Sequence, residues 1–176
     1  MLADLKIYKN KKKALQSLLI SAGICLLLGI TFIYGLGIFD TIFKVKVAVV
    51  SGILFVFILI LLLKALWSLN DKSPVYELTK ETGMGKTTPL SKALGTFYWK
   101  DVKGMQLNKV GGDTLLTIDL GNAEYYQTKL SKMFFKMAYD PSTEELQLSY
   151  SASEIDMSIQ ELQDVFQTYW KESQAV

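Results

Sequence analysis

The sequence contains no histidine, one cysteine and no arginine, since all 19 basic residues are lysines. The chain therefore lacks the residues required for zinc sites built on Cys and His, for Ser-His-Asp or Cys-His nucleophile systems, for disulfide frameworks and for arginine fingers. The formal net charge is only +2 and half of the residues are apolar, which excludes a disordered chain or a nucleic-acid-binding tail. We therefore expect a protein that is not an enzyme, holds no cofactor or metal and binds no nucleic acid.

Two long uncharged apolar runs dominate the first half of the chain. They cover residues 14–39 and 47–63. A bilayer core needs about 20 apolar residues in a helix, which the second run reaches when it extends to Trp67. A buried soluble helix of this length would need a polar face, and a signal peptide would have a shorter apolar stretch. The sequence therefore predicts transmembrane spans at about 14–39 and 47–67.

Lysines flank the first run unevenly. Five of them lie within residues 6–13, before the first span, whereas the connection between the spans holds only Lys44 and Lys46. Because lysines are enriched on the cytoplasmic side of membrane helices, both termini are expected in the cytoplasm. The predicted organisation is a lysine-rich cytoplasmic N-terminus at 1–13, a transmembrane hairpin at 14–68 and a cytoplasmic domain at 69–176.

The second half of the chain has the pattern of one small antiparallel β domain. Short segments rich in β-branched and aromatic residues alternate with turn residues such as Gly111-Gly112, whose glycines suit a two-residue hairpin turn. The predicted strands are 74–79, 94–102, 104–110, 113–120 and 145–151.

Two helices accompany these strands. One is predicted from Asn122 to Met137, where apolar residues recur at helical spacing on one face: Tyr126, Leu130, Met133, Phe134 and Met137. The other follows Ser158, which forms a capping box with Glu161 and precedes an apolar stripe. The expected fold class is α+β: a transmembrane helical hairpin, then a small antiparallel β domain with an inserted helix and a closing C-terminal helix.

Residues 83–88, GMGKTT, look like the end of a phosphate-binding loop. That loop requires a glycine where this chain has Lys80, and a long following helix for which Pro89 and Gly95 leave no room. We therefore expect a turn that exposes Lys80 and Lys86.

Paired carboxylates are the other candidate for a catalytic site, since such pairs can act in acid/base catalysis. Asp113 and Asp119 lie on one predicted strand, and Glu144 and Glu145 lie beside a turn. None has the apolar neighbours that would raise its pKa for acid/base work, so all are expected to be solvated.

Lys129, Lys132 and Lys136 lie on one side of the predicted inserted helix, next to its apolar face. Basic and apolar faces together suit a helix at a membrane surface. The alternative is that the helix packs its apolar face on the strands and shows its lysines to water, where acidic lipids or an acidic protein could still reach them. With Lys80 and Lys86, these lysines form the candidate membrane or partner surface.

The lysine-rich start, the two spans, the segment from Gly95 to Val102 and the closing segment to Trp170 resemble one bacterial family. Its members are two-span inner-membrane proteins of unknown function with a cytoplasmic domain similar to pleckstrin-homology (PH) domains. The firmest points of resemblance are Gly95, Trp99 and Asp101. The resemblance implies a PH-like barrel closed by a C-terminal helix, located at the bacterial inner membrane. PH-like domains bind lipid head groups or proteins, and here lysines would replace phosphate-binding arginines.

These features predict a non-enzymatic, membrane-anchored binding or scaffold protein. Besides the bilayer itself, anionic lipid head groups and a membrane-associated protein are candidate partners. The alternative is an accessory or immunity subunit whose hairpin packs against a larger membrane complex or toxin, since Ser17, Ser21 and Gly29 would allow close helix approach. Self-association of the chain stays open.

Overall fold

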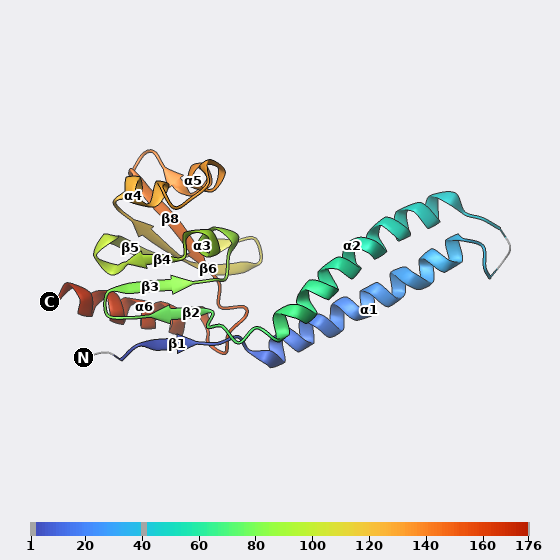
Figure 1. Ribbon diagram of the computed structural model, residues 1–176, viewed down its shortest axis with the longest axis horizontal. Helices are drawn as coiled ribbons and strands as arrows, with labels where there is room; N and C mark the ends of the chain where they lie inside the picture. Colours follow the sequence, from blue (N-terminus) through green and yellow to red (C-terminus); the bar gives the residue numbers. More distant parts are fainter. Residues whose placement is uncertain (1–2, 40–41, 176) are drawn as a thin grey trace. The chain divides into compact units, whose positions relative to one another are not determined.

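The computed structural model describes residues 3–39 and 42–175; expectations about residues 1, 2, 40, 41 and 176 lie outside the described part. The chain forms two compact units (Figure 1). One is a helical hairpin, Asn10–Lys72, and the other is a β-rich domain made of the residues up to Lys9 and from Ser73 onward. The α+β class is confirmed in its coarse form, with two long apolar helices and two antiparallel sheets.

The hairpin consists of α1, Lys11–Gly35, and α2, Val45–Leu69. Asn10 begins α1 as its N-cap, since its side chain accepts hydrogen bonds from two backbone N–H groups of the first turn, at 2.8 and 3.1 Å. Both helices are long and apolar enough to cross a membrane, and only 11% of each apolar window is buried inside the molecule. The core helix of a soluble protein would be mostly buried, so this hairpin presents an apolar surface to its surroundings.

Glycines let the two helices of the hairpin approach closely. A Cβ on Gly35 would lie 2.6 Å from the backbone nitrogen of Ala48, and a Cβ on Gly52 would lie 2.9 Å from the ring of Phe32. Gly29 also faces the other helix, with a ring carbon 3.3 Å from where its Cβ would be. These small residues therefore serve packing within the hairpin.

The domain contains two four-stranded antiparallel sheets. The first has the order β1-β2-β3-β4, with β1 Leu5–Ile7, β2 Tyr76–Leu78, β3 Thr82–Gly85 and β4 Thr96–Tyr98. The second has the order β5-β6-β8-β7, with β5 Val102–Val110, β6 Asp113–Leu120, β7 Tyr139–Asp140 and β8 Glu145–Tyr150. The helical elements are α3 Pro89–Leu94, the 3-10 turn Trp99–Asp101, α4 Ala123–Gln127, α5 Lys132–Ala138 and α6 Ile159–Gln174.

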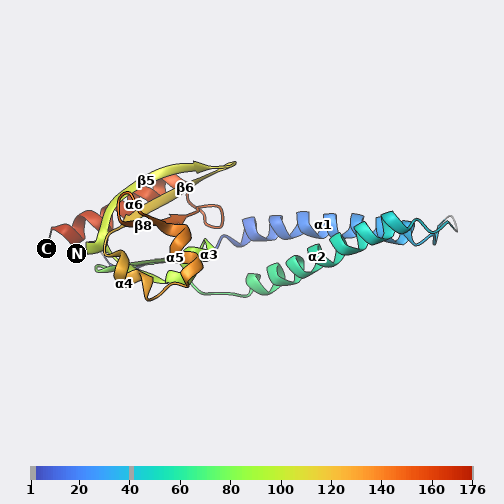
Figure 2. The same ribbon diagram turned by 90° about the horizontal axis from the view of Figure 1, so that it is seen from above.

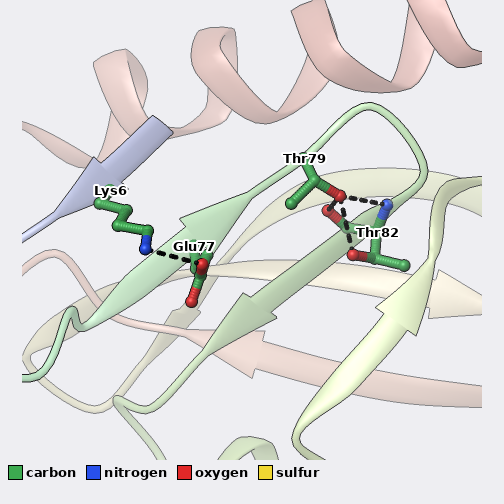
Figure 3. Close-up of polar contacts among 4 residues, drawn as sticks. All are labelled: Lys6, Glu77, Thr79 and Thr82. Atoms are coloured by element: carbon green, nitrogen blue, oxygen red, sulfur yellow. Dashed lines mark hydrogen bonds and ion pairs between the residues drawn. The ribbon is translucent and has the colours of Figure 1, made fainter. Parts of the chain in front are cut away.

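Residues 1–13, expected to be only a lysine-rich flank, supply the first strand of the domain. β1 pairs with β2, and the backbone N–H of Val75 donates to the carbonyl of Ile7 at 2.8 Å. An ion pair joins Lys6 to Glu77 at 3.2 Å (Figure 3). The hairpin is therefore inserted, in sequence, between two neighbouring strands of one sheet.

The predicted strands are present at least in part, and the short strands β1 and β7 were not predicted. The segment at 94–102 is divided between β4 and β5 by the 3-10 turn, and residues 82–85, expected in a turn, form β3. The two-residue hairpin turn is confirmed: Val110 pairs with Asp113, and Gly111 has φ +62°. β5 and β6 form a long curved hairpin (Figure 2).

Two threonines hold the β2–β3 turn (Figure 3). The hydroxyls of Thr79 and Thr82 are 2.9 Å apart, and the backbone N–H of Thr82 donates to the Thr79 hydroxyl at 3.1 Å. The carbonyl of Thr79 accepts from the indole nitrogen of Trp99 at 2.9 Å. This bond satisfies the only polar side-chain atom of a fully buried tryptophan.

The predicted C-terminal helix is confirmed as α6. Ser158 and Glu161 form its capping box, with backbone-to-side-chain hydrogen bonds of 3.2 and 2.7 Å. Phe166 of this helix is fully buried, and its ring centroid lies 5.7 Å from those of Tyr76 and Trp99. α6 therefore contributes to the aromatic core shared with the first sheet.

Candidate functional site

The helix predicted over 122–137 is two short helices, α4 and α5, separated at residues 128–131. Ser131 begins α5 as its N-cap, and its hydroxyl accepts from the backbone N–H of Phe134 at 3.3 Å. Leu130, within the separation, is buried. Because the chain leaves the helical path before α5 begins, the predicted apolar face does not continue from α4 into α5.

Four residues of α5 face outward: Lys132, Met133, Lys136 and Met137, which we name the α5 strip. Met133 and Met137 are 64% and 74% exposed, and both lysines are exposed as well. The opposite side of the helix carries Ala138, which is buried in the core. The apolar face was expected either at a membrane surface or packed on the strands. The structure buries Tyr126 and Leu130 in the core and leaves the two methionines among the lysines on the surface.

A cluster of tyrosines and lysines lies where α4 approaches the end of β4. The ammonium of Lys129 is 4.5 Å from the ring centroid of Tyr125, and that of Lys100 is 5.3 Å from the ring centroid of Tyr98. The two rings are 6.2 Å apart. Hydrogen bonding to Lys129 lowers the pKa of Tyr125, and hydrogen bonding to Tyr125 raises the pKa of Tyr98. These contacts hold Lys129 beside the aromatic rings.

The residues that carry the family resemblance have structural roles. Gly95 ends α3 with φ +74°, a conformation that favours glycine. Trp99 is buried between the sheets and α6. The carboxylate of Asp101 accepts from the hydroxyl of Tyr126 at 2.7 Å, and the same hydroxyl accepts from the backbone N–H of Tyr98 at 3.1 Å. Helical spacing predicted Tyr126 on an apolar face, and the sequence offers no local signal for the hydrogen bond of its hydroxyl with Asp101.

Lys80 and Lys86 lie on other elements than the three lysines of the α4–α5 segment. Lys80 is exposed in the β2–β3 turn, as expected, whereas Lys86 follows β3 and is only half-exposed. The four residues of β3 lie between the two lysines. At about 3.3 Å per residue, they place Lys80 and Lys86 beyond opposite ends of this strand, roughly 10 Å or more apart. The five candidate lysines therefore divide into Lys80, Lys86 and a group of three on the α4–α5 segment.

The two glycines of the phosphate-loop lookalike lie in β3 and face the core. A Cβ on Gly83 would lie 2.5 Å from the ring of Phe97, and a Cβ on Gly85 would lie 2.5 Å from the ring of Tyr150. The helix that follows, α3, has six residues and is capped by Thr88. These glycines make room for aromatic side chains, which explains the motif without a bound phosphate.

Asp119 differs from the solvated carboxylate that we expected. Burial raises its pKa, and the nearby charges of Glu145 and Asp140 raise it further. Its Oδ1 atom is buried without a hydrogen-bond partner. Successive side chains of a strand point to opposite faces of the sheet. Ile118 is buried in the core, so the side chain of Asp119 lies on the other face. Within residues 3–39 and 42–175, no group of three acidic, cysteine or histidine residues is arranged to hold a metal ion.

No protein-family model matches the chain, and neither the curated proteins nor the solved structures contain a match to it.

Proposed function

We propose that this chain is a non-enzymatic, membrane-anchored binding or scaffold protein that presents a PH-like domain at the cytoplasmic face of a bacterial inner membrane. One observation carries the proposal: a hairpin of two long, exposed, apolar helices is inserted between two paired strands of a folded domain. In water that apolar surface would be costly, and a bilayer would solvate it.

The strand pairing supports the proposed topology. β1 precedes α1 and β2 follows α2, and the two strands are neighbours in one sheet. A hairpin that crosses a membrane between them must therefore return to the side from which it started. The five lysines within residues 6–13 favour the cytoplasm as that side.

The connections between the hairpin and the domain are short. Three residues separate β1 from α1, and six separate α2 from β2. Even fully extended, these connections reach only about 10 and 20 Å. A domain tethered in this way meets membrane-associated partners at a high effective concentration, which favours a binding role with weak intrinsic affinity.

Two antiparallel sheets closed by a C-terminal helix are the arrangement expected from the family resemblance. Gly95, Trp99 and Asp101 have the structural roles that a fold motif would have. These observations support a PH-like interpretation of the domain. A binding role fits this chain better than catalysis because its sequence lacks arginine and histidine, and without histidine it cannot form Ser-His-Asp or Cys-His nucleophile systems.

Crosslinking and affinity capture from native membranes test the proposal. The full chain is compared with a chain in which residues 10–72 are replaced by a short Gly-Ser linker, which keeps β1 beside β2. A partner retained by both chains would support recognition by the domain. Turnover of a nucleotide, lipid or peptide by either purified chain would contradict the proposal, as would release of the full chain from membranes by alkaline carbonate.

The accessory or immunity subunit is the second candidate, and the hairpin surface is the observation that favours it. Gly23 of α1 has open space around the position of a Cβ, so another helix could approach there. Gly29, Gly35 and Gly52, in contrast, pack within the hairpin. A partner captured only by the full chain, and lost when Gly23 is replaced by Leu, would favour this candidate.

A further inference from the structure

The α5 strip is both apolar and basic, and neither property alone would indicate a binding surface. Met133 and Met137 are one helical turn apart and are both more than half exposed. Lys132 and Lys136 are also one turn apart and lie beside them. Single exposed apolar residues are ordinary, but two flexible methionines flanked by lysines form a compact apolar and basic surface.

The chain itself does not neutralise this surface. Lys132 and Lys136, together with Lys129 just before α5, form no ion pair within residues 3–39 and 42–175. Lys129 is held instead against the ring of Tyr125. On the α4–α5 segment, Glu124 is the acidic residue, and three lysines outnumber it. The α4–α5 segment is therefore positively charged, although Asp140 lies two residues beyond α5 and the domain from residue 69 onward has 11 lysines and 15 acidic residues.

A phospholipid surface has the complementary chemistry. The cytoplasmic leaflet is negatively charged and attracts lysines within a Debye length, and its acyl boundary accepts methionine side chains. An acidic protein surface would pair with the charges of the lysines but would offer the two methionines less apolar contact than a lipid surface. The short connections to the hairpin would also keep this domain near a bilayer, whereas a protein partner would have to be recruited.

We propose that the α5 strip and Lys129 form a contact site for the anionic surface of the bilayer that anchors the chain. This inference rests on the proposed function, because it assumes that the hairpin spans that bilayer. Met133 and Met137 enter the boundary between head groups and acyl chains, while the three lysines bind lipid phosphates as point charges. The contact holds the domain in one orientation and leaves its other faces open to a protein partner.

Site-specific fluorescence on the full chain tests the inference. Cys25 is replaced by Ala, and a fluorophore is attached at Met137→Cys; the protein is then reconstituted into vesicles of phosphatidylcholine with or without roughly one-third phosphatidylglycerol. We expect head-group nitroxide lipids to quench the label at least about twofold more in the anionic vesicles, and the excess to disappear near 1 M salt, where the Debye length is about 3 Å. Equal quenching in both vesicles would overturn the inference.

Matched controls separate the strip from the rest of the surface. A label at Val110→Cys replaces another exposed apolar residue beside a lysine, at the tip of the β5–β6 hairpin, and should show no lipid-dependent excess. Replacing Lys129, Lys132 and Lys136 by Gln should abolish the excess at position 137. Replacing three exposed lysines elsewhere, Lys92, Lys103 and Lys109, should preserve it. If both triple variants lost the excess quenching equally, the total charge of the protein would explain the effect, and this result would contradict a defined site.

Two further outcomes distinguish failure of the site from failure of the anchor. If alkaline carbonate releases the full chain from the vesicles, the anchoring itself is wrong. If the chain stays in the membrane but label 137 is quenched by aqueous iodide and not by lipid nitroxides, only the contact site is wrong. Shielding of the label from both quenchers would indicate a protein contact on α5 and would also overturn the inference.

Discussion

The carbonyl of Ile7 accepts a hydrogen bond from the backbone N–H of Val75 at 2.8 Å, and the whole helical hairpin lies between these two residues in sequence. The bond extends the pairing of β1 with β2. The domain is thus assembled from both flanks of the hairpin, and its first strand comes from the segment that precedes α1.

A domain without β1 should be markedly less stable. We expect residues 73–176 alone to lose about 3 kcal/mol of unfolding free energy relative to residues 1–9 joined to 73–176 by a short linker. The loss comes from partly buried Leu5 and Ile7 and from the hydrogen bond that Tyr169 donates to the carbonyl of Ala3. Urea unfolding followed by tryptophan fluorescence measures the difference.

The matched control for that experiment is Lys6→Ala in the joined chain. The ion pair of Lys6 with Glu77 is solvent-exposed, so its removal should cost less than about 1 kcal/mol. A control loss as large as the loss of the whole strand would show that the ion pair, rather than strand burial, holds β1 in place.

Tyr126→Phe should destabilise the domain by about 2 kcal/mol. The variant removes the hydroxyl that donates to Asp101 and accepts from the backbone N–H of Tyr98, and thereby leaves two polar groups without their partner. Tyr125→Phe, on the neighbouring exposed residue, should change stability by less than about 0.5 kcal/mol. Thermal unfolding of the two variants measures both effects, and equal losses would contradict the structural role of the bond.

Gly85→Ala should cost about 2 kcal/mol or more, because the new Cβ would lie 2.5 Å from the ring of Tyr150 and 2.7 Å from that of Tyr76. Gly112→Ala, in a turn with open space around the Cβ, is the control and should be nearly neutral. Chemical denaturation measures both. A neutral Gly85→Ala would mean that the sheet can move away from the aromatic core.

Asp119→Asn should stabilise the domain at neutral pH. The pKa of Asp119 is higher in the folded state than in the unfolded state, because of burial and then of Glu145 and Asp140, so the folded state binds the proton more tightly. Stability is therefore lost as pH rises from the unfolded to the folded pKa, and stays lower above it. The variant should melt at a higher temperature near pH 7, with a smaller gain near pH 3, below the usual aspartate pKa of about 3.9.

Glu161→Gln should change the melting temperature in the direction opposite to Asp119→Asn. Hydrogen bonds with Ser158 lower the pKa of Glu161, so its carboxylate stabilises the folded state above its unfolded pKa, and this contribution is lost as pH falls. The variant should melt at a lower temperature near pH 7 and approach the parent protein in acid. If Asp119→Asn lowered the melting temperature near pH 7, as Glu161→Gln should, the assignment of the Asp119 shift to burial would be wrong.

The lysines of the candidate surface could be predicted from a local sequence pattern. Lys129, Lys132 and Lys136 were identified from their spacing, and the structure places them on one segment. Helical periodicity placed Met133 and Met137 on one apolar face with Tyr126 and Leu130. It could not predict that Ser131 begins a new helix, with the methionines exposed and the other two residues buried. The tyrosine rings around Lys129 come from separate elements, which a sequence pattern cannot bring together.

The sequence by itself determined the hairpin and α6, because an uncharged apolar run and a Ser158–Glu161 capping box act within one element. It also determined the β5–β6 turn through Gly111. Only the tertiary structure decided that Leu5–Ile7 is a strand, because three residues carry no periodic signal and their partner lies beyond the hairpin. The same holds for Gly83 and Gly85, whose role becomes visible only where distant aromatic rings press against their backbone.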